Sequence, residues 1–336
     1  MKLALYLLWA AGFTLFLGLI SYHGLSDVAV AVAAAGWGLG VVVAYHAIPL
    51  LVDTFGWLVL LPAPHRRPWT QLLAMRWIAD SVNQLLPVAT VGGELVRAQR
   101  LSHTSVPGPM AGATVVVDLT AAVLTQIAFA LLGLALLLLH GGADDVVLGV
   151  TVGVGTFSLL LLGFFLAQRA GMFESLARVL EWVASGGDWL SLIGSAAELD
   201  RSVTQLYQQR DPFWSSCAWH FAFWLLGTGE VWLAMHFLGH PVTLLEALVL
   251  ESLVGAVRAA AFAVPGGLGV QEGGLIVLGS LLGVDATAAL SLSLVKRVRE
   301  LAFGLPGLLV WQLQEGRRLL HKRTQSNPPT DQPSNP

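Results

Sequence analysis

Long apolar runs dominate this sequence and constrain its fold more than any other feature. A helix needs about 20 apolar residues to cross the ~30 Å hydrocarbon core of a bilayer. Runs of about that length or longer occupy residues 3–22, 28–61, 113–139, 146–167, 213–238, 243–264 and 287–313. Because lipid offers no water to backbone N–H and C=O groups, helices are the natural spanning elements. The sequence therefore predicts an all-α polytopic membrane protein.

Composition agrees with lipid as the solvent and narrows the function. Charged residues make up only 12% of the 336 residues, whereas a soluble domain carries about 25%. The net charge of −3 argues against nucleic acid as a partner. One cysteine, Cys217, allows neither a disulfide framework nor a thiolate metal site within one chain. His220 and His236 lack ligand spacing, so we expect no metal and no cofactor.

The distribution of lysine and arginine predicts the orientation. Cytoplasmic loops are enriched in these residues, which occur at 66–67, 169 and 317–323 and are absent from 23–27, 140–145 and 239–242. Both termini are then cytoplasmic. Segment 70–109 must leave and return on the cytoplasmic side, and segment 243–284 on the outer side. We expect about six spanning helices plus two oppositely oriented re-entrant helical hairpins.

The two predicted hairpins share a motif. Each has a proline, six residues and a glutamate, with glycines between: Pro87 to Glu94, and Pro265 to Glu272. Proline ends a helix and glycine allows positive φ. The expected breaks are Pro87, Gly92, Gly93, Pro265, Gly266, Gly267 and Gly269. Ordinary Pro-Gly loops would explain either motif alone, but the matched spacing on opposed hairpins favours an inverted repeat of the kind found in transporters.

The last apolar run contains four charges, Lys296, Arg297, Arg299 and Glu300. Each charge at the bilayer centre costs ~2.5–3.5 kcal/mol on insertion scales, so these side chains must pair or line a polar cavity. Lys296 and Glu300 are spaced i, i+4 and can pair locally. We expect Arg297 and Arg299 to find partners in the two motif glutamates or in an anionic headgroup.

Other polar residues also lie where lipid would exclude them. Helical spacing puts Arg76, Asp80 and Asn83 on one face, and Glu251 and Arg258 on another; Asp118 and Glu230 lie within spans. Structural pairing explains any one of them, whereas the set as a whole indicates a polar internal cavity. The candidate substrate-binding residues are Glu94, Arg97, Arg258, Glu272, Lys296, Arg297, Arg299 and Glu300.

Two segments differ from the rest. Residues 172–212 form a cytoplasmic amphipathic segment, with Leu176, Val179, Leu180 and Val183 at helical spacing; it either lies on the membrane surface or packs on other cytosolic loops. We expect residues 316–336 to be a disordered cytoplasmic tail, because the polar end of the chain cannot bury a core. Residues 1–315 then form a single transmembrane domain.

The motif residues carry a resemblance. Leu86-Pro87, Gly92-Gly93-Glu94 and Arg97, with Val264 to Gly273, are similar to the lysylphosphatidylglycerol-synthase transmembrane, or flippase-like, family. Ala256 to Phe262 and Ser293 to Glu300 resemble its hopanoid-associated branch. The resemblance implies lipid movement in a bacterial inner membrane, with membrane lipids and hopanoid-biosynthesis or lipid-export proteins as partners. The soluble lysyltransferase domain of two-domain relatives has no counterpart within these 336 residues, so the synthase activity is not carried over.

These observations favour a lipid carrier that is not an enzyme. The substrate would be a hopanoid or another polar-headed lipid, with its headgroup in the charged cavity and its tails in the bilayer. A membrane-embedded lipid-modifying enzyme would use the same cavity with a glutamate as general base, but no nucleophile or metal-ligand pattern accompanies the charges. A scaffold for a hopanoid or glycolipid assembly would not need charges at mid-depth.

Overall fold

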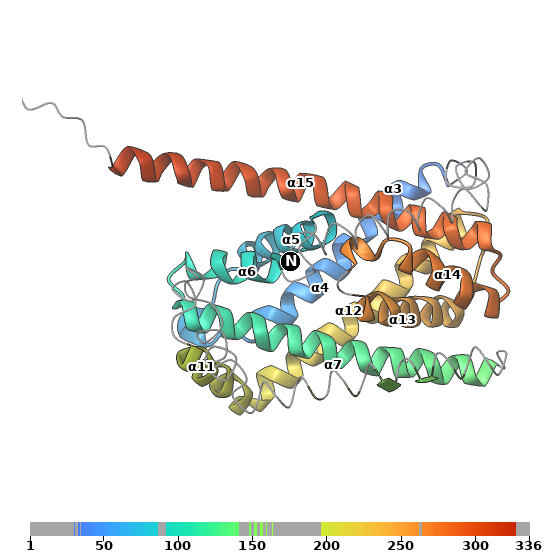
Figure 1. Ribbon diagram of the computed structural model, residues 1–336, viewed down its shortest axis with the longest axis horizontal. Coiled ribbons are helices and arrows are strands. Elements are labelled where there is room, and N and C mark those ends of the chain that lie inside the picture. The colour runs from blue at the N-terminus through green and yellow to red at the C-terminus, as the bar shows by residue number, and fades with distance from the viewer. Residues whose placement is uncertain are drawn as a thin grey trace, which may run out of the picture.

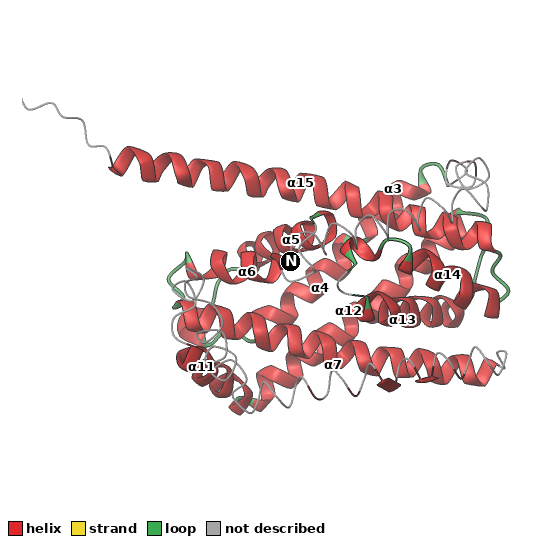
Figure 2. Cartoon of the chain, in the orientation of Figure 1, coloured by secondary structure: helices red, strands yellow, loops and turns green. Residues whose placement is uncertain are grey.

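The computed structural model describes residues 35–86, 92–140, 196–261 and 264–326, with a few isolated positions elsewhere; beyond Gln314 it describes the backbone alone. In these parts the chain is built of helices and loops without strands (Figure 2). The expected spans 3–22 and 146–167, the amphipathic positions 176–183 and the expected break at Pro87 lie outside the described residues.

The first described helices form one kinked segment, α3 (Gly38–Tyr45) and α4 (Ala47–Leu58). The two helices are separated by one residue, His46. Pro49 explains this position, because its ring clashes with the carbonyl of the residue four earlier and has no N–H to donate to it. That residue is Tyr45, where α3 ends. A short 3₁₀ turn, η1 (Ala63–His65), follows.

Two pairs of packed helices, called the hairpins below, flank the two sequence motifs. The first joins α5 (Trp69–Leu85) to α6 (Gly92–Ser102). The second joins α13 (Leu244–Ala260) to α14 (Val270–Leu281) through the 3₁₀ turn η2 (Pro265–Gly267). The two helices of each hairpin pack on each other, and η2 lies against α5. Positive φ angles at Gly266, Gly267 and Gly269 allow the chain to turn so tightly there.

Long helices frame the hairpins: α7 (Gly108–His140), α12 (Arg210–Phe237) and α15 (Ala286–Ser326) (Figure 1). Within the described residues, the segments Gly38–Leu58 and Gly108–Leu139 are long and apolar enough to cross a bilayer. Helices α12 and α15 are long as well but contain charges. Exposed leucines along α7 and α15 are suited to lipid surroundings; they include Leu131, Leu138, Leu139, Leu305, Leu309 and Leu313.

Helix α15 continues beyond the expected end of the transmembrane domain. We expected disorder from residue 316, whereas the structure describes one helix to Ser326. Arginine, leucine and lysine between 317 and 323 are good helix formers. The described helix reaches Ser326, and the sequence that follows, Asn327-Pro328-Pro329, disfavours helix.

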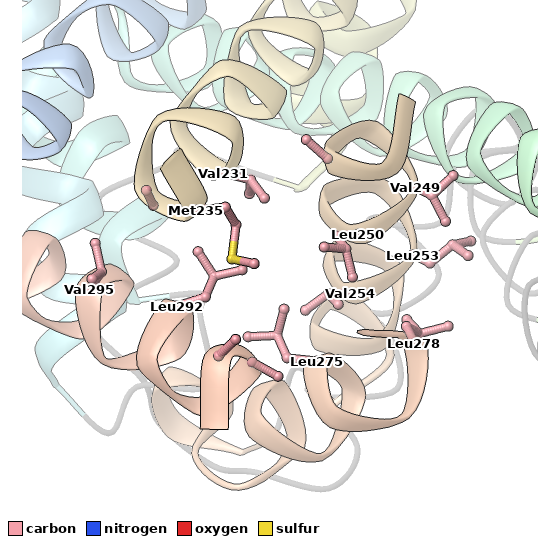
Figure 3. Packing of buried hydrophobic residues seen from close by; sticks show 14 of the residues in the cluster. Val231, Met235, Val249, Leu250, Leu253, Val254, Leu275, Leu278, Leu292 and Val295 are labelled. Carbon is pink, nitrogen blue, oxygen red and sulfur yellow. The ribbon is translucent and has the colours of Figure 1, made fainter. Parts of the chain in front are cut away.

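Apolar packing joins these helices into a single bundle. The largest cluster lies where α12, α13, α14 and α15 meet, and includes Met235, Leu250, Leu253, Leu275 and Leu292 (Figure 3). A second cluster holds α11 (Ala196–Gln208) on α7 and α12 through Leu199, Val203 and Leu206. The end of the 172–212 segment thus packs on other helices through its apolar face.

A capping box begins α13 and gives a test of the local structure. The Thr243 hydroxyl accepts the Glu246 N–H at 3.2 Å, and Glu246 accepts the Thr243 N–H at 2.7 Å. We expect Thr243→Ala to lower stability by about 1 kcal/mol, because it leaves the Glu246 N–H without its partner. Thermal unfolding of the detergent-purified protein measures this loss. Thr243→Ser keeps the acceptor and should unfold like the wild type; equal losses in both variants would contradict the capping role.

Candidate functional site

A cavity of about 400 Å³ lies at the centre of the described helices. Its wall comes from the α3–α4 junction and from α4, α5, α7, α12, α13 and α15. Apolar side chains, including Leu50, Phe223, Trp224 and Val254, make up part of the wall. The charged part contains five carboxylates and three permanent cations: Asp53, Asp80, Glu230, Glu251, Glu300, Arg258, Lys296 and Arg299.

One buried ion-pair network, the first network, connects the hairpin α5–α6 to α4, α7 and α12. Asp118 on α7 is its centre and contacts Arg76 at 2.5 Å, Arg97 at 2.6 Å and His220 at 2.9 Å. Arg76 also binds Asp53, which lies 2.7 Å from the other ring nitrogen of His220. With a carboxylate beside each ring nitrogen, His220 has the surroundings that an imidazolium satisfies.

The first network also reaches the first turns of α6, where that helix packs on α5. Arg97 pairs with Glu94 at 2.6 Å and lies 4.6 Å from the centre of the Trp57 ring, a cation–π contact. Asn83 accepts the Gly93 N–H at 2.8 Å. A Cβ atom at Gly93 would collide with the carbonyl oxygen of Ala79. Gly93 is therefore required for the close approach of α6 to α5.

A second network connects the hairpin α13–α14 to α15. Glu272, fully buried, accepts the Gly269 N–H at 2.7 Å, the Ser293 hydroxyl at 2.6 Å and the Arg297 guanidinium at 3.1 Å. Arg297 also donates to the Gly266 carbonyl in the turn and to Glu300 at 2.9 Å. Glu272 and Arg297 thus fix the glycine-rich turn to α15, a structural role.

The second network reaches the cavity through its other members. Arg258 lies 3.3 Å from Glu300 and donates to Gln271 at 2.8 Å. Arg299 lies 3.0 Å from Glu230, and His46 contacts both of them, at 3.2 and 2.8 Å respectively. Lys296 pairs with Glu251 across the cavity wall.

The structure divides the eight candidate binding residues into two groups. Arg258, Lys296, Arg299 and Glu300 line the cavity. The remaining four, Glu94, Arg97, Glu272 and Arg297, lie in the networks beside it and are absent from its wall. Whether the eight bind a substrate stays a prediction.

The expected ion pairs are partly realised. Arg297 pairs with Glu272, as predicted. Lys296 does not pair with Glu300, because Glu251 on the facing helix α13 is closer to its ammonium. The second expected glutamate, Glu94, pairs with Arg97 on its own helix, so Arg299 pairs with Glu230 instead. The predicted i, i+4 pair of Lys296 with Glu300 was therefore wrong.

Sequence reasoning missed the roles of two histidines, His46 in the cavity wall and His220 in the first network, and gave too little weight to two carboxylates in the wall. His46 and His220 carried no motif, and only their long-range partners Glu230 and Asp53 identify them. Asp53 and Asp80 lay in apolar or amphipathic helical runs, so the cost of burying a charge was the available signal. Among the described residues, no group of three His, Cys, Asp or Glu side chains is arranged to hold a metal ion.

Comparison with known proteins relates this chain to membrane proteins. Residues 5–307 match the family described as the lysylphosphatidylglycerol synthase TM region. A curated relative, a UPF0104 membrane protein of Pyrococcus horikoshii, is 24% identical over 246 residues; the alignment covers 69% of this chain and 72% of the relative.

Proposed function

Since this chain belongs to the lysylphosphatidylglycerol synthase TM region family and is a membrane protein, we propose that it carries a polar-headed lipid across the bilayer. The headgroup would enter the central cavity while the tails stay in the hydrocarbon. The observation that carries this proposal is the charged cavity of about 400 Å³. Charged groups at membrane depth are costly, and they mark substrate pathways when they face a polar cavity.

The helix contacts support an inverted repeat as the basis of movement. Helix α5 packs on α15, and its counterpart α13 packs on α7. In the same way, α6 packs on α7 and α14 on α15, while α4 and α12 pack on each other. The first helix of each hairpin therefore packs on the long helix of the other half, and the second helix packs on the long helix of its own half. We propose that the halves rock against each other and expose the cavity to each membrane face in turn.

The hairpin lengths support a re-entrant path. Helices α5 and α13 have 17 residues each, and α6 and α14 have 11 and 12. At 1.5 Å per residue they extend about 25 Å and about 16–18 Å, less than the ~30 Å of hydrocarbon. We propose that each hairpin enters and leaves on one face, the first from the cytoplasm and the second from outside, among about six spanning helices.

The sequence resemblance supports a proposal for the lipid substrate and for the membrane in which the protein lies. We propose a bacterial inner-membrane location with cytoplasmic termini, and a hopanoid or another polar-headed lipid as substrate. Hopanoid-biosynthesis or lipid-export proteins are the corresponding partners. We propose further that the lipid is moved without chemical change, because most wall carboxylates are occupied in ion pairs and are poorly placed as free bases.

Reconstitution tests the proposal. The protein is incorporated into vesicles that contain a trace of headgroup-labelled lipid, and a membrane-impermeant quencher reports the label that reaches the outer leaflet. We expect the label to reach the outer leaflet faster than in protein-free vesicles. The measurement is made both with and without a proton gradient across the vesicle membrane. Chromatography of the recovered lipid should show the starting species. Absence of movement for every lipid class tried would overturn the carrier, and a new lipid species would establish an enzyme.

A further inference from the structure

One carboxylate in the cavity wall differs from its neighbours. Asp80, on α5, is partly exposed and lines the cavity. Within the described part of the chain it makes no hydrogen bond or ion pair, whereas Asp53, Glu230, Glu251 and Glu300 each have a cationic partner. Arg76 and Arg97 act on Asp80 only at a distance, and a carboxylate held in a low-dielectric wall without a direct ion pair or hydrogen bond is costly. A cation supplied by a ligand would offset that cost.

The matching position of the other hairpin holds a cation, Arg258, and its side chain is the most exposed of the three permanent cations in the cavity wall. Arg258 precedes Pro265 by seven residues, just as Asp80 precedes Pro87, and both line the same cavity. The Arg258 side chain is 28% exposed, compared with 7% for Lys296 and for Arg299. Its bond to Glu300 is long, at 3.3 Å. Equivalent places in the two halves thus present opposite charges to the cavity.

The remaining wall argues against a purely anionic headgroup. Five carboxylates and three permanent cations line the cavity. A headgroup that carries only negative charge would therefore add to the excess of negative charge in the wall. Phe223 and Trp224 also line it, and aromatic faces attract ammonium groups. The wall therefore favours a ligand that brings a positive charge together with its phosphate.

We infer that the cavity selects a zwitterionic phospholipid headgroup, with its phosphate on Arg258 and its ammonium on Asp80. This inference rests on the proposed function for the route by which the lipid arrives. A guanidinium fork matches phosphate oxygens in geometry and charge. Because the two residues stand at equivalent places, the headgroup could meet the same pair of charges when the halves rock.

Binding to the purified protein tests the inference apart from transport. The probes are short-chain phosphatidylethanolamine and phosphatidylglycerol, titrated into detergent-solubilised protein and followed by native mass spectrometry. We expect phosphatidylethanolamine to bind about tenfold more tightly, the range of one charge-assisted hydrogen bond. Asp80→Asn should remove this preference, and Arg258→Gln should weaken both lipids. The exposed Asp211→Asn serves as a control and should bind like the wild type.

A charge exchange distinguishes a specific pair from a general field. The double variant Asp80→Arg with Arg258→Asp keeps one charge of each sign, so it should prefer phosphatidylethanolamine over phosphatidylglycerol as the wild type does. Equal binding of the two lipids by wild type, or a preference that survives Asp80→Asn, would overturn the inference. Selective binding without any movement in vesicles would refute the carrier and leave the headgroup assignment standing. Movement in vesicles without selective binding would refute the headgroup assignment and leave the carrier standing.

Discussion

Replacing Asp118 with asparagine should destabilise this protein more than the loss of any other single charge in its two ion-pair networks. The carboxylate is almost fully buried and contacts Arg76, Arg97 and His220. Asparagine keeps the shape of the side chain but leaves three buried cationic or polar partners without their common anion. Removing one member of a buried ion pair costs about 3–5 kcal/mol.

The lower end of this range is expected, because each partner keeps a second carboxylate. Arg76 and His220 remain beside Asp53, and Arg97 remains beside Glu94. A loss of about 3 kcal/mol should appear as a lowered midpoint in tryptophan-fluorescence thermal unfolding in detergent, and as less folded protein in size-exclusion chromatography.

A matched control separates pairing from burial. Asp80 is another carboxylate in the same region, but it has no ion pair within the described residues, so Asp80→Asn leaves no orphaned partner. Its unfolding midpoint should equal or exceed that of the wild type. If Asp118→Asn unfolds at the same temperature as Asp80→Asn, the first network does not hold the helices together.

The break between α13 and α14 could be predicted from the sequence because its signals are local. Proline at 265 and glycines at 266, 267 and 269 restrict or free φ at their own positions, so a break could be placed without knowing the fold. The structure has the 3₁₀ turn η2 there, with positive φ at all three glycines. Similarly, the end of α3 follows from a single proline four residues later.

Ion-pair partners were less predictable because they depend on helices distant in sequence. Lys296 has Glu300 one turn away, yet it pairs with Glu251, 45 residues earlier. Glu230 and His46 are 184 residues apart. The insertion cost of charge shows that such side chains must be paired, but only the packing of α3, α12, α13 and α15 decides which ones meet.

The substitution Ala259→Trp should abolish lipid movement while the protein stays folded. Ala259 lines the cavity on α13, next to Arg258, and an indole there would occupy space that the headgroup needs. We expect at least about a tenfold loss of rate in the vesicle assay, because even about 1.36 kcal/mol of added barrier has that effect. The cavity offers room for the ring, so overpacking should be milder than in a dry core, where it costs about 1–3 kcal/mol.

The neighbouring residue provides the control for this blockade. Ala260 is on the same helix but is exposed and outside the cavity wall, so Ala260→Trp adds an equal volume without filling the cavity. It should move lipid at the wild-type rate. Wild-type movement by Ala259→Trp would mean that lipid bypasses this cavity, and the route would then have to follow the exposed apolar faces of α7 and α15. An equal loss of lipid movement in both variants would indicate that a large side chain on α13 impairs movement of the hairpin, and that the indole does not act by blocking the headgroup.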